Sequence, residues 1–433
     1  KMNNGKWAVI FGNGYNNTAA DGKASSDGRA YLYILMLDGP GPFSSSSARG
    51  NQWTLGTDYY KIQLTAPNEG STTPLSPANG LSTVYGVDKN GDNLVDYLYA
   101  GDRYGNLWKI DVSSSNPASW GSAFGSSSTP LPLFTAVTAD STPKRQQITT
   151  SPFVQPNPNG GFMVMFGTGS FVDISDNTGP FDTDSFYGIW DKDDGTQVTG
   201  RSQLQRQASL AYDSSSGYGI VSNCSVQYSA TATAPSAATT FCPSSLAPAL
   251  DPNGKVAQQL GWVLDLNFQL SSTNTGERYI SSPLPILNNG LLSFRTITPS
   301  NDPCSGLFTD FDYNLNYLTG GQYQQPIYYA FGTSTPTPIA LTFNIGGTTV
   351  TGVHPSGRTV VPPGTSGAPG SGQNQKPFTV VGPNPYSPTT GCAMVAGRPC
   401  RNPHWQCSPN GTATPACIRA PATGRVSWRQ IMQ

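Results

Sequence analysis

Apolar residues recur in short runs of strand length along most of the chain, and almost no segment has the spacing of an amphipathic helix. Each run is bounded by Gly, Pro, Asn or Asp, the residues that favour turns. The pattern predicts β-strands within residues 6–15, 29–38, 58–64, 96–102, 105–112, 160–171, 185–191, 261–268, 291–297 and 326–332.

A loose internal repeat connects several of these strands. In each unit an apolar strand ends in Gly-polar-Gly or Gly-Asp, a loop follows, and a second strand ends in Asp. The units are VIFGNGY…AYLYILMLD, YLYAGDRYGNLWKID and VMFGTGSF…SFYGIWD. Hairpins at irregular intervals are typical of propeller blades with inserted loops, although a β-sandwich also consists of short strands joined by turns. We therefore predict an all-β fold, a modified and irregular β-propeller of seven blades with long inserted loops.

Composition divides the chain into two parts. Low-complexity insertions separate the predicted hairpins at residues 40–52, 112–130 and 225–240. Residues 354–391 have the composition of a Pro/Gly-rich linker with one possible strand. We predict a propeller domain over residues 1–353 and a Pro/Gly-rich, cysteine-stapled segment over residues 354–433 that packs on or closes the propeller.

Charge is sparse in these 433 residues, because Asp, Glu, Lys and Arg make up only 11%, against roughly 25% in ordinary globular proteins. The net charge of −1 and the lack of a basic patch argue against a nucleic-acid partner. The longest apolar run, at residues 31–38, is too short to span a bilayer. Residue 1 directly precedes a strand-like segment and no signal peptide is evident, so we expect a mature product or an excised domain.

Seven cysteines indicate an oxidising, extracytoplasmic compartment. Cys224 and Cys242 bracket a Ser/Ala/Thr-rich loop, as a loop-closing disulfide would. Four more lie in the Pro/Gly-rich tail, where disulfides could replace a missing core: Cys392, Cys400, Cys407 and Cys417. A zinc cluster is the alternative, but CxxC pairs are lacking and His404 is the only nearby histidine. Cys304 is left without an assigned partner.

The stretch DKNGDNLVD, residues 88–96, is the strongest candidate for a functional site. Asp88, Asn90, Asp92 and Asp96 place oxygen donors at the first, third, fifth and ninth positions of a tight loop, and Leu94 adds a backbone carbonyl at the seventh. Clustered carboxylates repel each other unless a cation lies between them. Oxygen ligands select Ca²⁺ or Mg²⁺, and this flexible set with several carboxylates favours Ca²⁺.

The loop departs from the EF-hand pattern in two ways. Its sixth position is Asn93 instead of Gly, and Asn tolerates positive φ better than most residues. Its twelfth position is Tyr99 instead of Glu, so Asp96 must supply the last carboxylate, and strands flank the loop in place of helices. A solvated, metal-free hairpin is the alternative. If calcium binds, it would fix the register of the following strands.

A second acidic stretch, residues 173–195, lacks this alternating spacing. Asp182 and Asp184 lie two residues apart, and Asp191, Asp193 and Asp194 cluster. A solvated loop is the better interpretation than a second ion site, because the spacing is not that of a known ligand loop.

Catalysis is the weaker hypothesis. His354 and His404 are the only histidines, both in the Pro/Gly-rich part, and Glu69 and Glu277 are the only glutamates. Glycine-rich segments end strands instead of opening helices, which disfavours a phosphate site. The strand GNLWKID is similar to blade motifs of quinone-cofactor dehydrogenases, but the vicinal cysteines and acidic cofactor ligands of those enzymes are not found.

Taken together, several motifs resemble the C-terminal domain of the PilC/PilY family of type IV pilus biogenesis and tip-adhesin proteins of Gram-negative bacteria. They are WAVIFGNGYN, VDKNGDNLVDYLYAGDRYGNLWKIDV, FGTGSF, GWVLDL…GER, ITPSNDPC and GRVSWRQI. They extend from residue 7 to residue 431 and so cover nearly the whole chain.

The resemblance implies a modified β-propeller at the pilus tip, the outer membrane surface or in the periplasm. It implies a calcium loop whose ligands map onto Asp88, Asn90, Asp92, Leu94 (carbonyl) and Asp96. The implied role is to support pilus extension against retraction, twitching motility and attachment to a host or abiotic surface, with minor pilins or the tip complex as partners. The family's N-terminal adhesive region is missing here, and the Arg-Gly-Asp motif of some members is absent, so integrin binding is not carried over.

Overall fold

The computed structural model describes residues 1–15, 27–40, 52–70, 75, 77–213, 218–229, 239, 241–248, 250, 252–280, 290–299, 309–323, 342–345, 347–351 and 357–360. Strands dominate this part of the chain, and its helices are short 3₁₀ turns. These turns are η2 (Pro67–Glu69), η3 (Pro117–Ser119), η4 (Ile174–Asn177), η5 (Arg201–Gln203) and η6 (Ser244–Leu246). Within the described residues, no helix is long and apolar enough to cross a bilayer.

The first two large sheets come from the N-terminal third of the chain. Sheet 1 has the order β1-β2-β3, with β1 (Ala8–Gly12), β2 (Ala30–Met36) and β3 (Tyr59–Leu64). Sheet 2 has the order β10-β6-β5-β4, and β7 also pairs with β6; its strands are β4 (Tyr85–Val87), β5 (Tyr97–Gly101), β6 (Asn106–Asp111), β7 (Gly121–Ser122) and β10 (Phe134–Thr135).

Two further large sheets follow. Sheet 3 has the order β11-β12-β13-β17-β14, with β11 (Phe153–Pro156), β12 (Phe162–Gly167), β13 (Ser185–Asp191), β14 (Gln205–Gln207) and β17 (Gly261–Asp265). Sheet 4 has the order β15-β16-β22-β19-β18, with β15 (Ser209–Asp213), β16 (Tyr218–Val221), β18 (Leu291–Thr298), β19 (Thr309–Asn316) and β22 (Gly357–Val360). Two small hairpins complete the described strands: β8 (Phe124–Ser126) with β9 (Thr129–Leu131), and β20 (Thr342–Ile345) with β21 (Thr348–Thr351).

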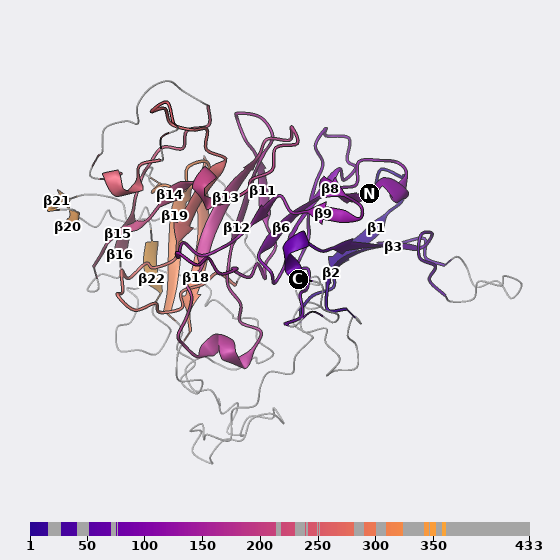
Figure 1. Cartoon of the computed structure of the whole chain (residues 1–433), viewed down its shortest axis with the longest axis horizontal. Helices are drawn as coiled ribbons and strands as arrows, with labels where there is room; N and C mark the ends of the chain where they lie inside the picture. The colour runs from indigo at the N-terminus through magenta and orange to yellow at the C-terminus, as the bar shows by residue number, and fades with distance from the viewer. Residues whose placement is uncertain are drawn as a thin grey trace, which may run out of the picture.

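The four large sheets succeed one another in chain order across the molecule, from β1–β3 at one side to β18, β19 and β22 at the other (Figure 1). Side chains of sheet 2 alternate between two hydrophobic clusters. Leu98 and Trp108 pack with sheet 1, whereas Tyr99 and Leu107 belong to the larger cluster that includes sheets 3 and 4. Since successive strand residues point to opposite faces, sheet 2 is buried on both faces, as a blade between two other blades is.

The predicted repeat units are confirmed as antiparallel hairpins. β1 pairs with β2, β5 with β6 and β12 with β13, and each pair lies in a different sheet. Nine predicted strands coincide with described strands, and the one within residues 326–332 lies outside the described residues. Because the described residues form four sheets of three or more strands, a two-sheet sandwich does not fit them. They do not test the count of seven blades or the boundary at residue 353.

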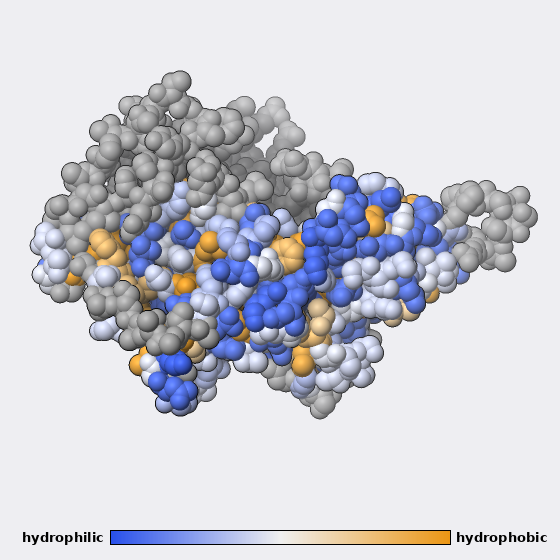
Figure 2. Space-filling model, turned by 90° about the horizontal axis from the view of Figure 1, so that it is seen from above, coloured by the Kyte–Doolittle hydropathy of each residue, from blue (hydrophilic) through white to orange (hydrophobic). Residues whose placement is uncertain are grey.

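The predicted loop-closing disulfide joins Cys224 to Cys242. The remaining cysteines, which include Cys304 and the four of the tail, lie outside the described residues, as do both histidines. Figure 2 shows a face of the molecule that is largely hydrophilic, with apolar residues scattered over it.

Candidate metal-binding loop

Residues 88–96 connect β4 to β5, which pair as an antiparallel hairpin with Val87 opposite Tyr97. Two residues of the loop have left-handed backbone conformations, Gly91 at φ 79° and Asn93 at φ 66°. The second of these is the position at which the sequence predicted that Asn could replace Gly, and the prediction is confirmed. The loop therefore turns tightly with strands on both sides.

Asp88 organises the first half of the loop. Its carboxylate accepts hydrogen bonds from the backbone N–H groups of Gly91 and Asn93, both at 2.7 Å. The side chain is exposed. A small desolvation effect opposes the shift, but the hydrogen bonds from backbone N–H groups, that of Asn93 foremost, lower the pKa of Asp88. Asp88 is thus held as a carboxylate at neutral pH.

The next two donors lie side by side on the exposed turn. The amide of Asn90 donates to Asp92 Oδ2 at 3.1 Å, and the backbone N–H of Asp92 donates to Asn90 Oδ1 at 3.0 Å. Asp92 Oδ1 in turn accepts the backbone N–H of Leu94 at 2.8 Å. These bonds bring together the side chains at the third and fifth positions of the loop.

Asp96 differs from the other three side chains because it is buried, with 5% of its surface exposed. Its Oδ2 accepts the backbone N–H of Lys89 at 2.8 Å, and its Oδ1 lies 3.4 Å from the amide nitrogen of Asn3. Asn3 also donates to the backbone carbonyls of Val95 and Val112 at 2.8 and 3.2 Å. The last predicted ligand is therefore fixed to both ends of the loop and to the N-terminal segment.

The donor set fits a hard cation in its chemistry. Every predicted ligand is an oxygen, and a carboxylate oxygen that accepts one hydrogen bond retains a lone pair for a metal ion. However, the described residues contain no group of three or more His, Cys, Asp or Glu side chains gathered closely enough to hold a metal. Asp88, Asp92 and Asp96 are thus on one loop without converging on one point. If Ca²⁺ binds, these carboxylates, the Asn90 amide oxygen and the Leu94 carbonyl would hold it.

Several aspartates of the second acidic stretch pair with cations, and the prediction of a solvated loop needs correction for its buried members, whereas Asp182 and Asp194 are exposed. Asp191 is 1% exposed, and its carboxylate lies 2.8 Å from Lys109 Nζ. Asp182 pairs with Lys144 at 2.6 Å. Further pairs join Asp173 to Arg103, Asp193 to Lys89 and Lys109, and Asp194 to Lys192. Most of these partners lie far away in the sequence, which a search for ligand spacing could not detect.

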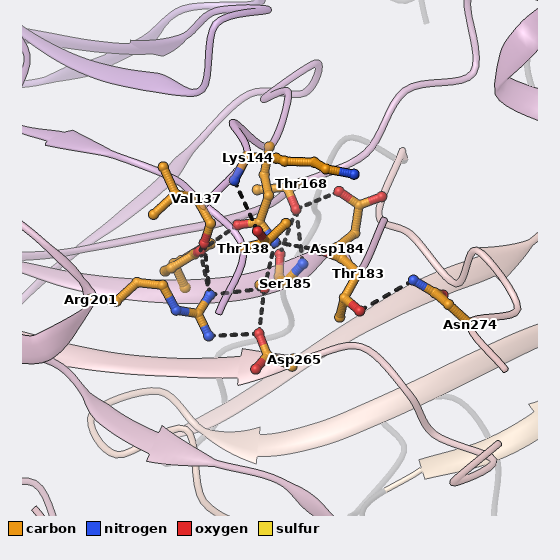
Figure 3. A network of polar contacts seen from close by, with 12 residues as sticks. Val137, Thr138, Lys144, Thr168, Thr183, Asp184, Ser185, Arg201, Asp265 and Asn274 are labelled. Atoms are coloured by element: carbon orange, nitrogen blue, oxygen red, sulfur yellow. Dashed lines mark hydrogen bonds and ion pairs between the residues drawn. The ribbon is translucent and has the colours of Figure 1, made fainter. Parts of the chain in front are cut away.

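Asp184 of the same stretch belongs to a polar network at one end of sheet 3 (Figure 3). Burial raises the pKa of Asp184 to about 6, and Thr168 donates its hydroxyl to the carboxylate. Nearby, Ser185 and Arg201 both donate to Asp265 Oδ1 at 2.7 Å. Arg201 also donates to Tyr187. Because these groups bond to one another between β13 and β17, we assign the network to holding sheet 3 together.

Sequence reasoning missed a buried carboxylate pair between sheets 1 and 2. Asp102, fully buried, accepts the indole N–H of Trp108 at 2.8 Å and the amide of Asn106 at 2.9 Å. The same Asn106 amide donates to Glu69 at 3.1 Å, and Asn79 donates to both carboxylates at 3.2 Å. The available signal was the order Asp-x-x-Gly-Asn-x-Trp within the repeat unit.

Comparison with known proteins identifies the kind of domain first. Residues 64–214 match the family model described as the PilY1 beta-propeller domain. The crystal structure of the Pseudomonas aeruginosa PilY1 C-terminal domain superposes with a TM-score of 0.55 at 24% identity, over 83% of this chain and 64% of that one. The chain is thus an all-β domain of the PilY1 propeller type.

Relatives then identify the family. The type IV pilus biogenesis factor PilY1 homolog of Xylella fastidiosa is 31% identical over 324 residues, and PilY1 of Pseudomonas aeruginosa strain PAO1 is 30% identical over 338 residues. Each match covers 74% of this chain but only 18% and 25% of the respective relative, so the chain spans a quarter of their length or less. These matches confirm the predicted resemblance to the PilC/PilY family.

Proposed function

We propose that this chain is a calcium-binding domain of a type IV pilus biogenesis and adhesion protein. One observation carries the proposal: the oxygen-rich loop of residues 88–96, closed by left-handed Asn93 and anchored through buried Asp96, lies in the hairpin of a PilY1-type blade. Family relatives that are named type IV pilus biogenesis factors support the pilus role.

In this mechanism Ca²⁺ relieves the repulsion among Asp88, Asp92 and Asp96 and draws the exposed side chains toward the anchored one. Asp96 is already fixed by the backbone of Lys89, so the exposed side chains are the ones that move. Ordering of the loop stabilises one of two conformations of the domain. The stabilised conformation engages minor pilins or the pilus tip complex and supports extension against retraction.

The wider role follows from the same proposal. The domain is a propeller of seven blades that lies outside the cytoplasm, at the pilus tip, the outer membrane surface or in the periplasm. There it contributes to twitching motility and to attachment to a host or abiotic surface. The disulfide between Cys224 and Cys242 supports an oxidising location. We propose no catalytic activity, since the relatives are named as biogenesis factors and no observation favours the quinone-dehydrogenase alternative.

Calorimetric titration of the chelator-stripped chain with Ca²⁺ and with Mg²⁺ tests the proposal. We expect one calcium site of roughly micromolar affinity, the range of regulatory sites, whereas a permanent structural ion would bind near the nanomolar end. Asp96→Ala should abolish binding. Because Asp96 is buried, Asp92→Asn serves as the milder variant: it keeps the oxygen that accepts the Leu94 N–H and removes the charge together with the acceptor of the exposed Asn90 amide. A wild-type chain that binds no calcium would refute the proposal and leave a solvated hairpin.

A further inference from the structure

We infer that calcium binding to the loop of residues 88–96 is coupled to the junction between sheets 2 and 3 through the ion pair of Lys89 with Asp193. The inference rests on the proposed function and adds its route of regulation. Lys89 is the second residue of the loop, between the first two predicted ligands. Its ammonium group leaves the loop and pairs with Asp193, which follows β13 of the neighbouring sheet.

The pair continues into a buried network on the facing sides of the two sheets. Lys109 of β6, only 3% exposed, lies 2.8 Å from Asp191 and 2.9 Å from Asp193. Tyr99 of β5 donates its hydroxyl to Asp191 at 2.6 Å. Two lysines of sheet 2 thus face two aspartates of sheet 3, and Lys89 is the member that also belongs to the loop.

Tyr97 brings the two lysines together at the edge of this network. Lys109 Nζ lies 4.1 Å from the centre of the Tyr97 ring, and Lys89 Nζ lies 3.4 Å from the Tyr97 hydroxyl. Asp193 has a left-handed φ of 58°, and its backbone N–H donates to Asp191 at 3.0 Å. Asp193 thus lies in a turn held by Asp191, and from there its carboxylate contacts both lysines.

Charge gives the direction of the coupling. Without an ion, the three loop aspartates carry three negative charges and compete with Asp193 for the ammonium group of Lys89. Calcium reduces that charge to −1, and it also repels Lys89. Both effects favour the pairing of Lys89 with Asp193. Since coupling between two sites is reciprocal, an intact pair strengthens calcium binding and calcium strengthens the junction of the sheets.

Calcium titration of the full chain, carried out as a double-mutant cycle, tests this coupling. Asp193→Asn should weaken calcium affinity about two- to five-fold, the range expected for a partly exposed ion pair. The matched control is Asp194→Asn. Asp194 is the next residue in the chain and carries the same charge, but it pairs with Lys192 instead of Lys89. In a Lys89→Met background the effect of Asp193→Asn should shrink to that of the control.

Hydrogen exchange supplies a readout that does not depend on affinity. Calcium should slow exchange of the amides at residues 190–195 in the wild-type chain but not in Lys89→Met, whose half-exposed side chain can be replaced without disturbing the core. If calcium binds, but Asp193→Asn equals Asp194→Asn in both backgrounds and exchange does not change, the coupling is overturned and the calcium site stands. A wild-type chain that binds no calcium overturns both.

Discussion

The loop of residues 88–96 and the pair formed by Asp102 and Glu69 are two acidic regions beside the same hairpin. They differ in how far their carboxylates are exposed to water. In the loop, Asp88, Asn90 and Asp92 are exposed and take hydrogen bonds chiefly from their own backbone. At the pair, Asp102 and Glu69 are 0% and 6% exposed and share the amides of Asn79 and Asn106. Carboxylates are thus solvated at Asp88 and Asp92 and buried among protein donors at Asp102 and Glu69.

The difference shows what burial does to a carboxylate. Hydrogen bonds from backbone N–H groups lower the pKa of Asp88, although slight desolvation acts against them. Burial, followed by the charge of Asp102, raises the pKa of Glu69 to about 7. Asp88 is therefore charged and accessible to a cation. In the pair, the carboxyl oxygens accept hydrogen bonds from Asn79 and Asn106, and Glu69 retains its proton up to about pH 7. Ion binding is the role proposed for the loop, whereas the hydrogen bonds of the pair connect the segments that follow β3 and β5.

The largest expected effect comes from Asp102→Ala. It leaves the Trp108 indole and the Asn106 amide without the acceptor that they share, inside a core that water does not reach. Removal of one member of a buried charged network costs about 3–5 kcal/mol of the free energy of unfolding. Urea denaturation should show this loss. Asp92→Ala in the presence of a chelator is the control and should leave the midpoint unchanged; equal losses in both variants would contradict the comparison.

A pH-dependent effect of intermediate size is expected from Glu69. Its folded-state pKa of about 7 lies above the ordinary value of 4.5, so between these pH values the folded chain binds more protons than the unfolded chain. Its contribution to stability is complete below about pH 4.5 and is lost as pH rises to about 7. The loss is at most roughly 3–4 kcal/mol, because Glu69 shares its proton uptake with Asp102.

Glu69→Gln isolates this effect from all other titrating groups. The variant has no carboxylate to ionise, so its free energy of unfolding relative to the wild type should increase between pH 5 and pH 8. Asp102 and Arg145 are the charged groups that act on Glu69, and both remain in the variant. Denaturation curves at four pH values measure the difference. A difference independent of pH would show that Glu69 stays ionised throughout.

The sequence predicted strands well wherever apolar and polar residues alternate beside glycine turns. β13 occupies residues 185–191 as predicted, and the three repeat units are hairpins of three sheets. β19 was missed although Phe311, Tyr313 and Leu315 are buried at alternate positions. Asp and Asn between them have low strand propensity and concealed the pattern. Pairing between strands that are distant in the sequence, as of β22 with β19 inside sheet 4, leaves no local signal at all.

Only those features of the loop at residues 88–96 that depend on the spacing of neighbouring residues could be predicted from the sequence. The loop, its flanking strands and the conformation of Asn93 follow from nine consecutive residues. The partners of the acidic side chains do not, because Lys109 and Asp193 are 84 residues apart in the chain and meet only when sheets 2 and 3 pack. Burial distinguishes Asp102 and Glu69 from the exposed Asp88 and Asp92, and burial is a property of the packed sheets.

The smallest expected effect on the fold, and a specific one on the ion, comes from Asp88→Asn. The side chain is exposed, and the amide oxygen of Asn can still accept one of the two backbone N–H groups that Asp88 holds. Thermal unfolding in a chelator should therefore match the wild type, whereas the rise in midpoint on addition of calcium should disappear, because one of three ligand charges is gone. Asp140→Asn, at another exposed aspartate, is the control and should retain the calcium response. If Asp88→Asn unfolded early in the chelator, the loop would be a structural element like the buried pair, and the contrast between the two acidic regions would be lost.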